Sequence, residues 1–288
     1  MPGVVRELLA ARNDGFCRIE ARTFWRRKLR WMLPALCGGS LLITLGVSAL
    51  SELIGVHLSD AAGGSGLPVQ LVGQIKAAAL AFAELDVLIV QVTVVIFLSR
   101  AFAVERERDT LESLALSGVE PGRLLACRFQ ARMRGFWLCL LVYMAPLFLK
   151  RQMVGAAVGR DQAFLALVPV ETLSLFATVA LWGAAAVLCG VLVRGLWATA
   201  LAFVITMFAV PIPVMVATVA ASGLYALSSG MDFAGWLRFL QDPTDPGALG
   251  MYLACTLTSA LTCASLALAC LALARKRLGR MLECPEGA

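Results

Sequence analysis

Long apolar runs alternate with short polar segments along almost the whole chain. Six runs stand out, at about residues 31–50, 77–99, 135–149, 172–193, 196–221 and 249–274. A helix needs about 20 apolar residues to cross the hydrocarbon core of a bilayer, so these runs predict membrane-spanning helices. The third run is short for a span, and the fourth has an apolar lead-in from Ala163. The pattern predicts an all-α polytopic membrane protein with six transmembrane helices.

Little sequence remains for a soluble domain, so residues 1–288 are predicted to form a single membrane domain. The longest polar or mixed stretches are residues 1–30 and 100–134. The first apolar run is longer than the core of a signal peptide and lacks a small-residue cleavage site, so we expect a retained span.

Composition and charge agree with this class and give the chain an orientation. Hydrophobic residues make up 60% of the chain and charged residues 15%, against about 25% in soluble domains. With the amino terminus inside, 20 of the 25 Lys and Arg residues fall on the cytoplasmic side. This bias predicts a multi-pass protein of the cytoplasmic (inner) membrane with both termini cytoplasmic. Lys150 and Arg151 are the exception, which suggests that the third run is misplaced at one end.

The net charge of +6 follows from the same bias and from attraction to anionic membrane lipid, so no nucleic-acid partner is predicted. Chemistry-bearing motifs are scarce. The sequence contains no phosphate-binding loop, no HExxH, no CxxC and one histidine, His57. Most of the 9 cysteines lie in apolar runs, where they act as small hydrophobic side chains. We expect no metal site and no catalytic site.

Two short helices are predicted outside the spans. Arg18, Arg22, Arg26 and Arg30 recur every four residues and would form one basic stripe, which favours an N-terminal helix lying in the membrane interface. The alternative is an ordinary basic flank of the first span. Residues 231–240 predict a short helix on the outer face, between spans five and six.

A dense charged run at residues 105–115 separates the second and third apolar runs. Asp109 is a candidate N-cap and Glu112 its capping-box partner, so a short amphipathic helix is expected to follow. Such a helix could dock into a groove on a soluble partner. On pattern alone, a solvated loop whose charges pair with one another, as Arg108 would with Glu112, is an equally good interpretation.

The residues of this run resemble a known family. Shortly after the second apolar run stands Glu105-Arg-Glu-Arg-Asp-Thr-Leu-Glu-Ser-Leu, which is similar to the first cytoplasmic loop of ABC-2 type transporter permeases. The likeness continues through residues 117–125 and extends to the expected topology. Asp109 stands where the family commonly has Gly, and Arg128 where Lys is common.

The resemblance implies a coupling helix that contacts a separate ATPase subunit. The contact residues would be Glu105, Glu107, Asp109, Thr110, Leu111 and Glu112. It further implies a permease of a prokaryotic inner membrane that works in export. The assembly would contain two copies of the ATPase and two permease subunits, and the second permease could be identical to this chain or different. ATP would be bound by the partner, and this chain would carry no cofactor and no enzyme activity of its own.

Polar residues and prolines within the spans are candidates for a translocation path. They are Glu84, Asp86, Gln91, Glu171, Pro211 and Pro213. The three acids could instead mark the water boundary, whereas Gln91 is predicted to face protein. The two prolines predict a break in backbone hydrogen bonding and a kink or hinge in span five.

Two other functions compete with transport. A membrane anchor or assembly protein would use the charged run to dock a partner that hydrolyses no nucleotide. A membrane enzyme would require Glu84, Asp86 and His57 to converge on one pocket.

Overall fold

The computed structural model describes residues 2–11, 15, 17–19, 21–22, 25, 38–39, 42, 46, 85–107, 120–158, 161–229 and 246–283. Within these ranges the protein is helical and has no strand, so the predicted all-α class is confirmed. The helices are α1 (Pro2–Ala11), α4 (Leu85–Glu107), α6 (Pro121–Val158), α7 (Asp161–Leu192), α8 (Leu196–Val204), the π-helix η1 (Ile205–Ala209), α9 (Pro211–Ser229) and α11 (Pro246–Glu283).

Three helical stretches in the described ranges are long and apolar enough to cross a membrane. They are Val168–Leu192, Leu196–Ser228 and Gly250–Leu282, and they coincide with the last three predicted spans. The second predicted span, at 77–99, overlaps a shorter apolar helix, Leu88–Val104, which continues beyond it. The first predicted span lies almost entirely outside the described residues, and the predicted outer helix at 231–240 lies entirely outside them. The membrane character is therefore supported, and the number six stays a prediction.

The helices extend beyond the apolar runs that predicted them. The third run, placed at 135–149, lies inside α6, whose 38 residues begin at Pro121. At 1.5 Å per residue α6 is about 57 Å long, well beyond a hydrocarbon core of about 30 Å. The helix is longer than the apolar run because Arg and Lys are good helix formers that prolong a helix past its apolar part. Lys150 and Arg151 lie in this helix.

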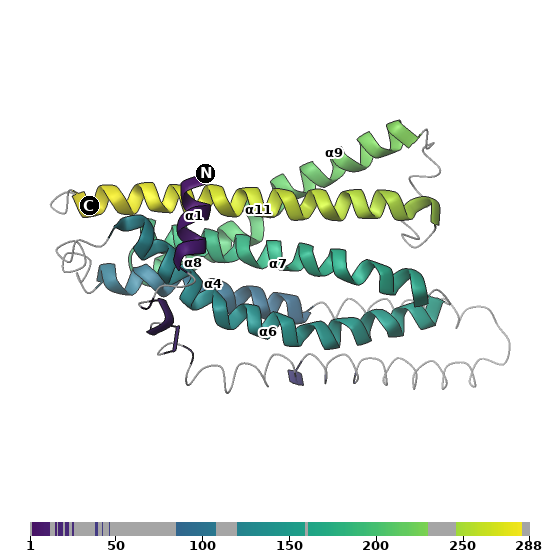
Figure 1. Ribbon diagram of the computed structural model, residues 1–288, viewed down its shortest axis with the longest axis horizontal. Coiled ribbons are helices and arrows are strands. Elements are labelled where there is room, and N and C mark those ends of the chain that lie inside the picture. Colours follow the sequence, from purple (N-terminus) through teal and green to yellow (C-terminus); the bar gives the residue numbers. More distant parts are fainter. Residues whose placement is uncertain are drawn as a thin grey trace.

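The long helices lie side by side, and the labelled N and C ends of the chain are at the same end of the bundle (Figure 1). A core of buried apolar side chains joins α4, α6, α7 and α11. Its largest members include Phe102, Met133, Phe136, Leu181 and Leu278. In contrast, α9 diverges from the bundle in Figure 1 and much of its apolar surface is exposed.

Two glycines of α7 allow α4 to approach closely. A Cβ on Gly190 would collide with the backbone carbonyl of Ser99, and one on Gly183 would lie 2.8 Å from the Leu98 side chain. Small residues at helix contacts serve this purpose in membrane bundles, where close backbone approach supplies much of the packing energy. These glycines fix α4 against the centre of the bundle.

The basic N-terminal helix stays a prediction, and its few described residues show which side chains are buried. Arg18 and Arg22 are exposed, while Cys17, Ala21 and Trp25 are buried. The buried side faces α6, and the indole Nε1 of Trp25 donates a hydrogen bond of 2.8 Å to the Ala131 carbonyl. Cys17, Ala21 and Trp25 are therefore covered by protein, while Arg18 and Arg22 are left exposed.

Candidate functional site

The predicted coupling segment begins in the last turn of α4. Glu105 and Glu107 belong to the last turn of α4, whose helix runs through the start of the charged run. Asp109, Thr110, Leu111 and Glu112 lie outside the described residues. The chain is described again from Glu120, and α6 begins at Pro121, where proline suits the first helical position.

Two arginines of α6 attach that helix to the end of α4. Arg128 donates from Nη1 to the Ala101 carbonyl at 2.9 Å, and Arg132 donates to the Phe97 carbonyl at 2.8 Å. Both donors and both acceptors are four residues apart, so each pair lies along one face of its helix. Charge-assisted hydrogen bonds of this kind are stronger than neutral ones. The helices on either side of the charged run are thus held together.

Burial strengthens the first of these contacts. The Arg128 side chain is only 7% exposed, and its guanidinium lies 5.2 Å from the centre of the Phe102 ring. A cation above an aromatic face is attracted by the ring quadrupole, and the attraction grows when water is excluded. The contact therefore resists separation of α4 from α6 close to the charged run.

The same end of the bundle carries an ionic junction between three helices. Arg275 of α11 pairs with Glu7 of α1 at 2.6 Å and lies 3.6 Å from Glu120, which directly precedes α6. A Cβ on Gly122 would collide with the Glu7 carboxylate, so that carboxylate lies against the first turn of α6. The positive end of a helix dipole favours a carboxylate there. Glu7 therefore links α1, α6 and α11.

Among the path candidates, Gln91 and the Pro211 region prove to be neighbours. Gln91 is 7% exposed, as the prediction that it faces protein requires, and its Nε2 donates to the Thr206 carbonyl at 3.4 Å. Thr206 lies in η1, where the Val210 N–H bonds the Ile205 carbonyl in the π register. The next donor in this register would be residue 211, and proline has no N–H.

Gln91 thus donates to the carbonyl that Pro211 leaves without a backbone partner. The predicted break in hydrogen bonding is confirmed, and its form is a π-helix directly before the proline. Freed backbone groups at membrane depth must find partners in the protein or in water. Here a side chain from α4 supplies one.

A second polar contact follows the same pair of helices. The hydroxyls of Ser99 and Thr199 are 2.9 Å apart, and Ser99 is fully buried. Eight residues separate Gln91 from Ser99 on α4, and seven separate Thr199 from Thr206, so each pair spans about two helical turns. Two polar contacts at matching intervals fix the register of α4 against α8 and η1.

The acidic path candidates are placed differently. Glu171 of α7 accepts a hydrogen bond from the Tyr252 hydroxyl of α11 and is partly buried near the start of a span. Asp86 belongs to the first turn of α4, and Glu84 and His57 lie outside the described residues. Glu171 thus bonds a side chain of α11, whereas Gln91 bonds a carbonyl of η1.

Several of these residues were missed by sequence reasoning. Thr206 and Tyr252 carry no pattern that sets them apart, because their importance comes from a neighbour on another helix. Arg128 and Arg132 did carry a signal, since two arginines four residues apart directly precede an apolar run. That spacing could have indicated contacts from one helix face to a neighbouring helix.

Across the ranges that the structure describes, no group of three or more His, Cys, Asp or Glu side chains could hold a metal ion, and six cysteines are free. The chain matches no family model, no curated protein and no solved structure.

Proposed function

We propose that this chain is the membrane-spanning permease subunit of an ABC-2 type ABC transporter, driven by ATP hydrolysis on a separate partner chain. The observation that carries the proposal is the charged run at 105–115, which resembles the family's coupling loop and lies between α4 and α6. The partner is an ABC ATPase present in two copies. A second permease, identical or different, completes the path, and the direction is export.

The contacts of α4 suggest how movement would pass from the ATPase to the span. A push on the charged run reaches α4 and α6 together, because Arg128 and Arg132 hold the two helices in contact. From Glu107 to Gln91 is about 24 Å along α4 at 1.5 Å per residue. At that distance Gln91 contacts η1, where the π-helix and Pro211 interrupt α-helical bonding.

An interrupted helix is the natural place for a span to bend. In the proposed mechanism, ATP-driven closure of the ATPase pair displaces α4. This changes the angle between α8 and α9 and opens the path to one side of the membrane. Gln91 holds η1, the segment that would bend, and Pro211 and Pro213 lie directly after it in the first turn of α9. Both termini face the cytoplasm in this arrangement, as the positive-inside bias predicts.

The test is affinity purification from the native membrane after mild crosslinking, with identification of partners and an ATPase assay. The variant is Glu105→Ala with Glu112→Ala. The control is Glu283→Ala, which removes an acidic residue at the end of α11, outside the charged run. We expect an ATP-binding subunit to co-purify with the wild type and the control, and to be lost or uncoupled in the variant.

Two results would count against the proposal. If no nucleotide-binding protein is captured with the wild type, the charged run serves another partner and the anchor or assembly function takes its place. If the control and the double variant lose the ATPase equally, the contact depends on charge in general and the coupling role of this run is wrong.

A further inference from the structure

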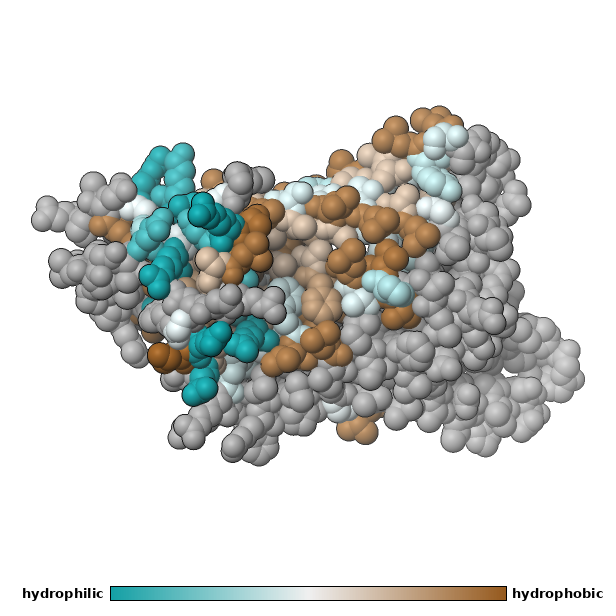
Figure 2. Space-filling model, in the orientation of Figure 1, coloured by the Kyte–Doolittle hydropathy of each residue, from teal (hydrophilic) through white to brown (hydrophobic). Residues whose placement is uncertain are grey.

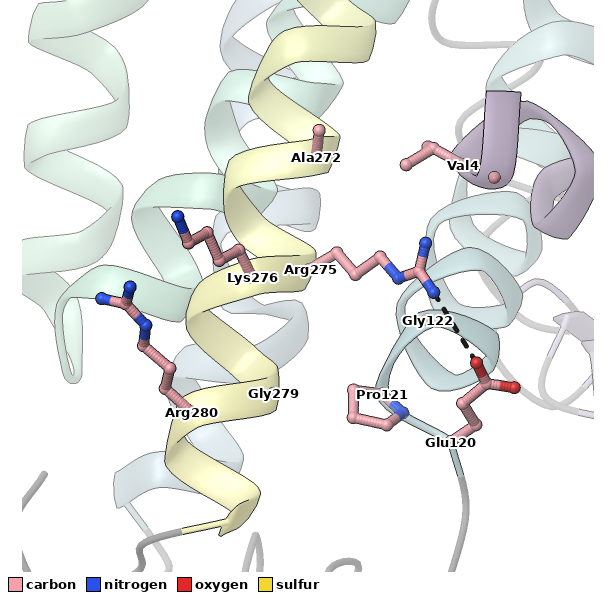
Figure 3. Close-up of a pocket in the computed structure, with 10 residues that line it drawn as sticks. Val4, Glu120, Pro121, Gly122, Ala272, Arg275, Lys276, Gly279 and Arg280 are labelled. Carbon is pink, nitrogen blue, oxygen red and sulfur yellow. Dashed lines mark ion pairs between the residues drawn. The ribbon is translucent and has the colours of Figure 1, made fainter. Parts of the chain in front are cut away.

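A cavity of about 490 Å³ lies between α1, the start of α6 and the C-terminal part of α11 (Figure 3). Small residues leave this space open. Gly3, Gly122, Ala272 and Gly279 line it, and a Cβ on Gly279 would meet no atom within 4 Å. Hydrophilic side chains gather at this end of the molecule, while apolar ones dominate farther along the bundle (Figure 2). The cavity is thus at the boundary between the polar end and the apolar body.

Three cations of α11 line the cavity, and only one is neutralised by a described carboxylate. Arg275 reaches across to Glu7 and Glu120. Lys276 and Arg280 extend from the other side of α11 in Figure 3, and both are exposed. Within the described ranges neither of them has an ion-pair partner. Like charges four residues apart on a helix repel one another, so an anion placed beside both would be stabilising.

The surroundings favour a phosphate group over other anions. Val4 and Ala272 give the cavity apolar walls, and Lys276 lies within the apolar stretch Gly250–Leu282 that is long enough to span a membrane. Basic pockets between helices at the cytoplasmic side of a membrane suit phospholipid headgroups, which combine a phosphate with apolar chains.

We propose that an anionic phospholipid binds at the rim of this cavity, with its phosphate beside Lys276 and Arg280 on α11. The proposal concerns the membrane domain alone, and it holds whether or not the chain couples to an ATPase.

The experiment measures lipid binding to the full-length protein in zwitterionic detergent, by native mass spectrometry and by thermal unfolding. Short-chain phosphatidylglycerol is compared with phosphatidylcholine, and inorganic phosphate is added in a separate arm. The charge variant is Arg280→Gln, and its matched control is Arg277→Gln, which removes one exposed charge from the same helix away from the cavity. The second variant is Gly279→Leu, which places a bulky apolar side chain in the cavity and keeps every charge.

We expect phosphatidylglycerol to bind and stabilise the wild type and the Arg277→Gln control. In Arg280→Gln the affinity should fall about five-fold, the scale of one basic residue at an anionic headgroup. In Gly279→Leu binding should be lost, and folding should persist because leucine favours a helix over glycine.

Three outcomes would overturn the proposal. Equal loss in the Arg277→Gln and Arg280→Gln variants would show a general charge effect. Full binding in Gly279→Leu would place the lipid elsewhere. Stabilisation by inorganic phosphate alone, to the same extent as by the lipid, would make a soluble phosphate the ligand.

Discussion

The contact between Gln91 and the Thr206 carbonyl gives a sharp prediction for Gln91→Leu. Leucine keeps the bulk of the side chain in a position that is only 7% exposed, and removes the donor. The Thr206 carbonyl then loses its side-chain donor, while Pro211 still offers no N–H. A buried unpaired acceptor costs about 1–3 kcal/mol, and side-chain hydrogen bonds in membrane bundles average about 0.6 kcal/mol.

Because the hydrogen bond is long, we expect the cost of losing it to be near the lower limit of this range. A separation of 3.4 Å between Nε2 and the carbonyl oxygen is longer than the usual hydrogen bond of about 2.9 Å, so we expect a loss of about 1 kcal/mol in the free energy of unfolding. For a chain of this size that loss corresponds to about 2 °C in Tm. Buried thiols at Cys189, Cys255 and Cys263 allow unfolding to be followed with a maleimide dye.

A double-mutant cycle separates this contact from other effects of the substitution. Pro211→Ala restores an N–H that can bond the Thr206 carbonyl within the helix, so Gln91→Leu should cost almost nothing in that background. The expected coupling energy is therefore about 1 kcal/mol. Thr93→Val is the control, because the Thr93 hydroxyl bonds the Ile89 carbonyl of its own helix. A coupling energy of zero would refute the assignment of Gln91 as the partner of the carbonyl that Pro211 leaves free.

Three further predictions concern the contacts that hold α4, α6 and the N-terminal segment together. Gly190→Ala should destabilise the protein by about 1–3 kcal/mol, because its Cβ meets a backbone carbonyl of α4, while Gly223→Ala, with open space around it, should not; thermal unfolding compares the two. Arg128→Gln should cost about 1.5–3 kcal/mol through the lost charge-assisted bond, and the exposed Arg134→Gln should be within about 0.5 kcal/mol of wild type; equal effects would contradict the proposed attachment of α4 to α6. Trp25→Phe keeps an aromatic ring and removes the indole donor, so it should cost about 1 kcal/mol, measured with the same dye; an unchanged Tm would show that ring packing alone matters there.

Hydropathy indicated where the long helices lie along the chain, but it did not indicate the residues at which they begin and end. The runs at 172–193, 196–221 and 249–274 correspond to helices able to span a membrane, because burial in lipid demands apolar side chains all round. The run at 135–149 marked only the middle of α6, and the last run stopped at Ala274 although α11 continues to Glu283. A helix continues into polar sequence as long as its backbone bonds are satisfied, which hydropathy does not register.

The sequence by itself determined the all-α class of this protein and two local facts. Gln91 had to face protein, because a primary amide is costly in lipid, and Pro211 had to disturb its helix, because proline has no N–H. Only the tertiary structure decided that these two facts are one contact. Residues 91 and 206 are brought together by the packing of α4 on α8 and η1, and no local pattern encodes which carbonyl a distant donor reaches. The same holds for Arg128 and Ala101 and for Glu7 and Arg275, since long-range pairing depends on how whole helices pack against one another.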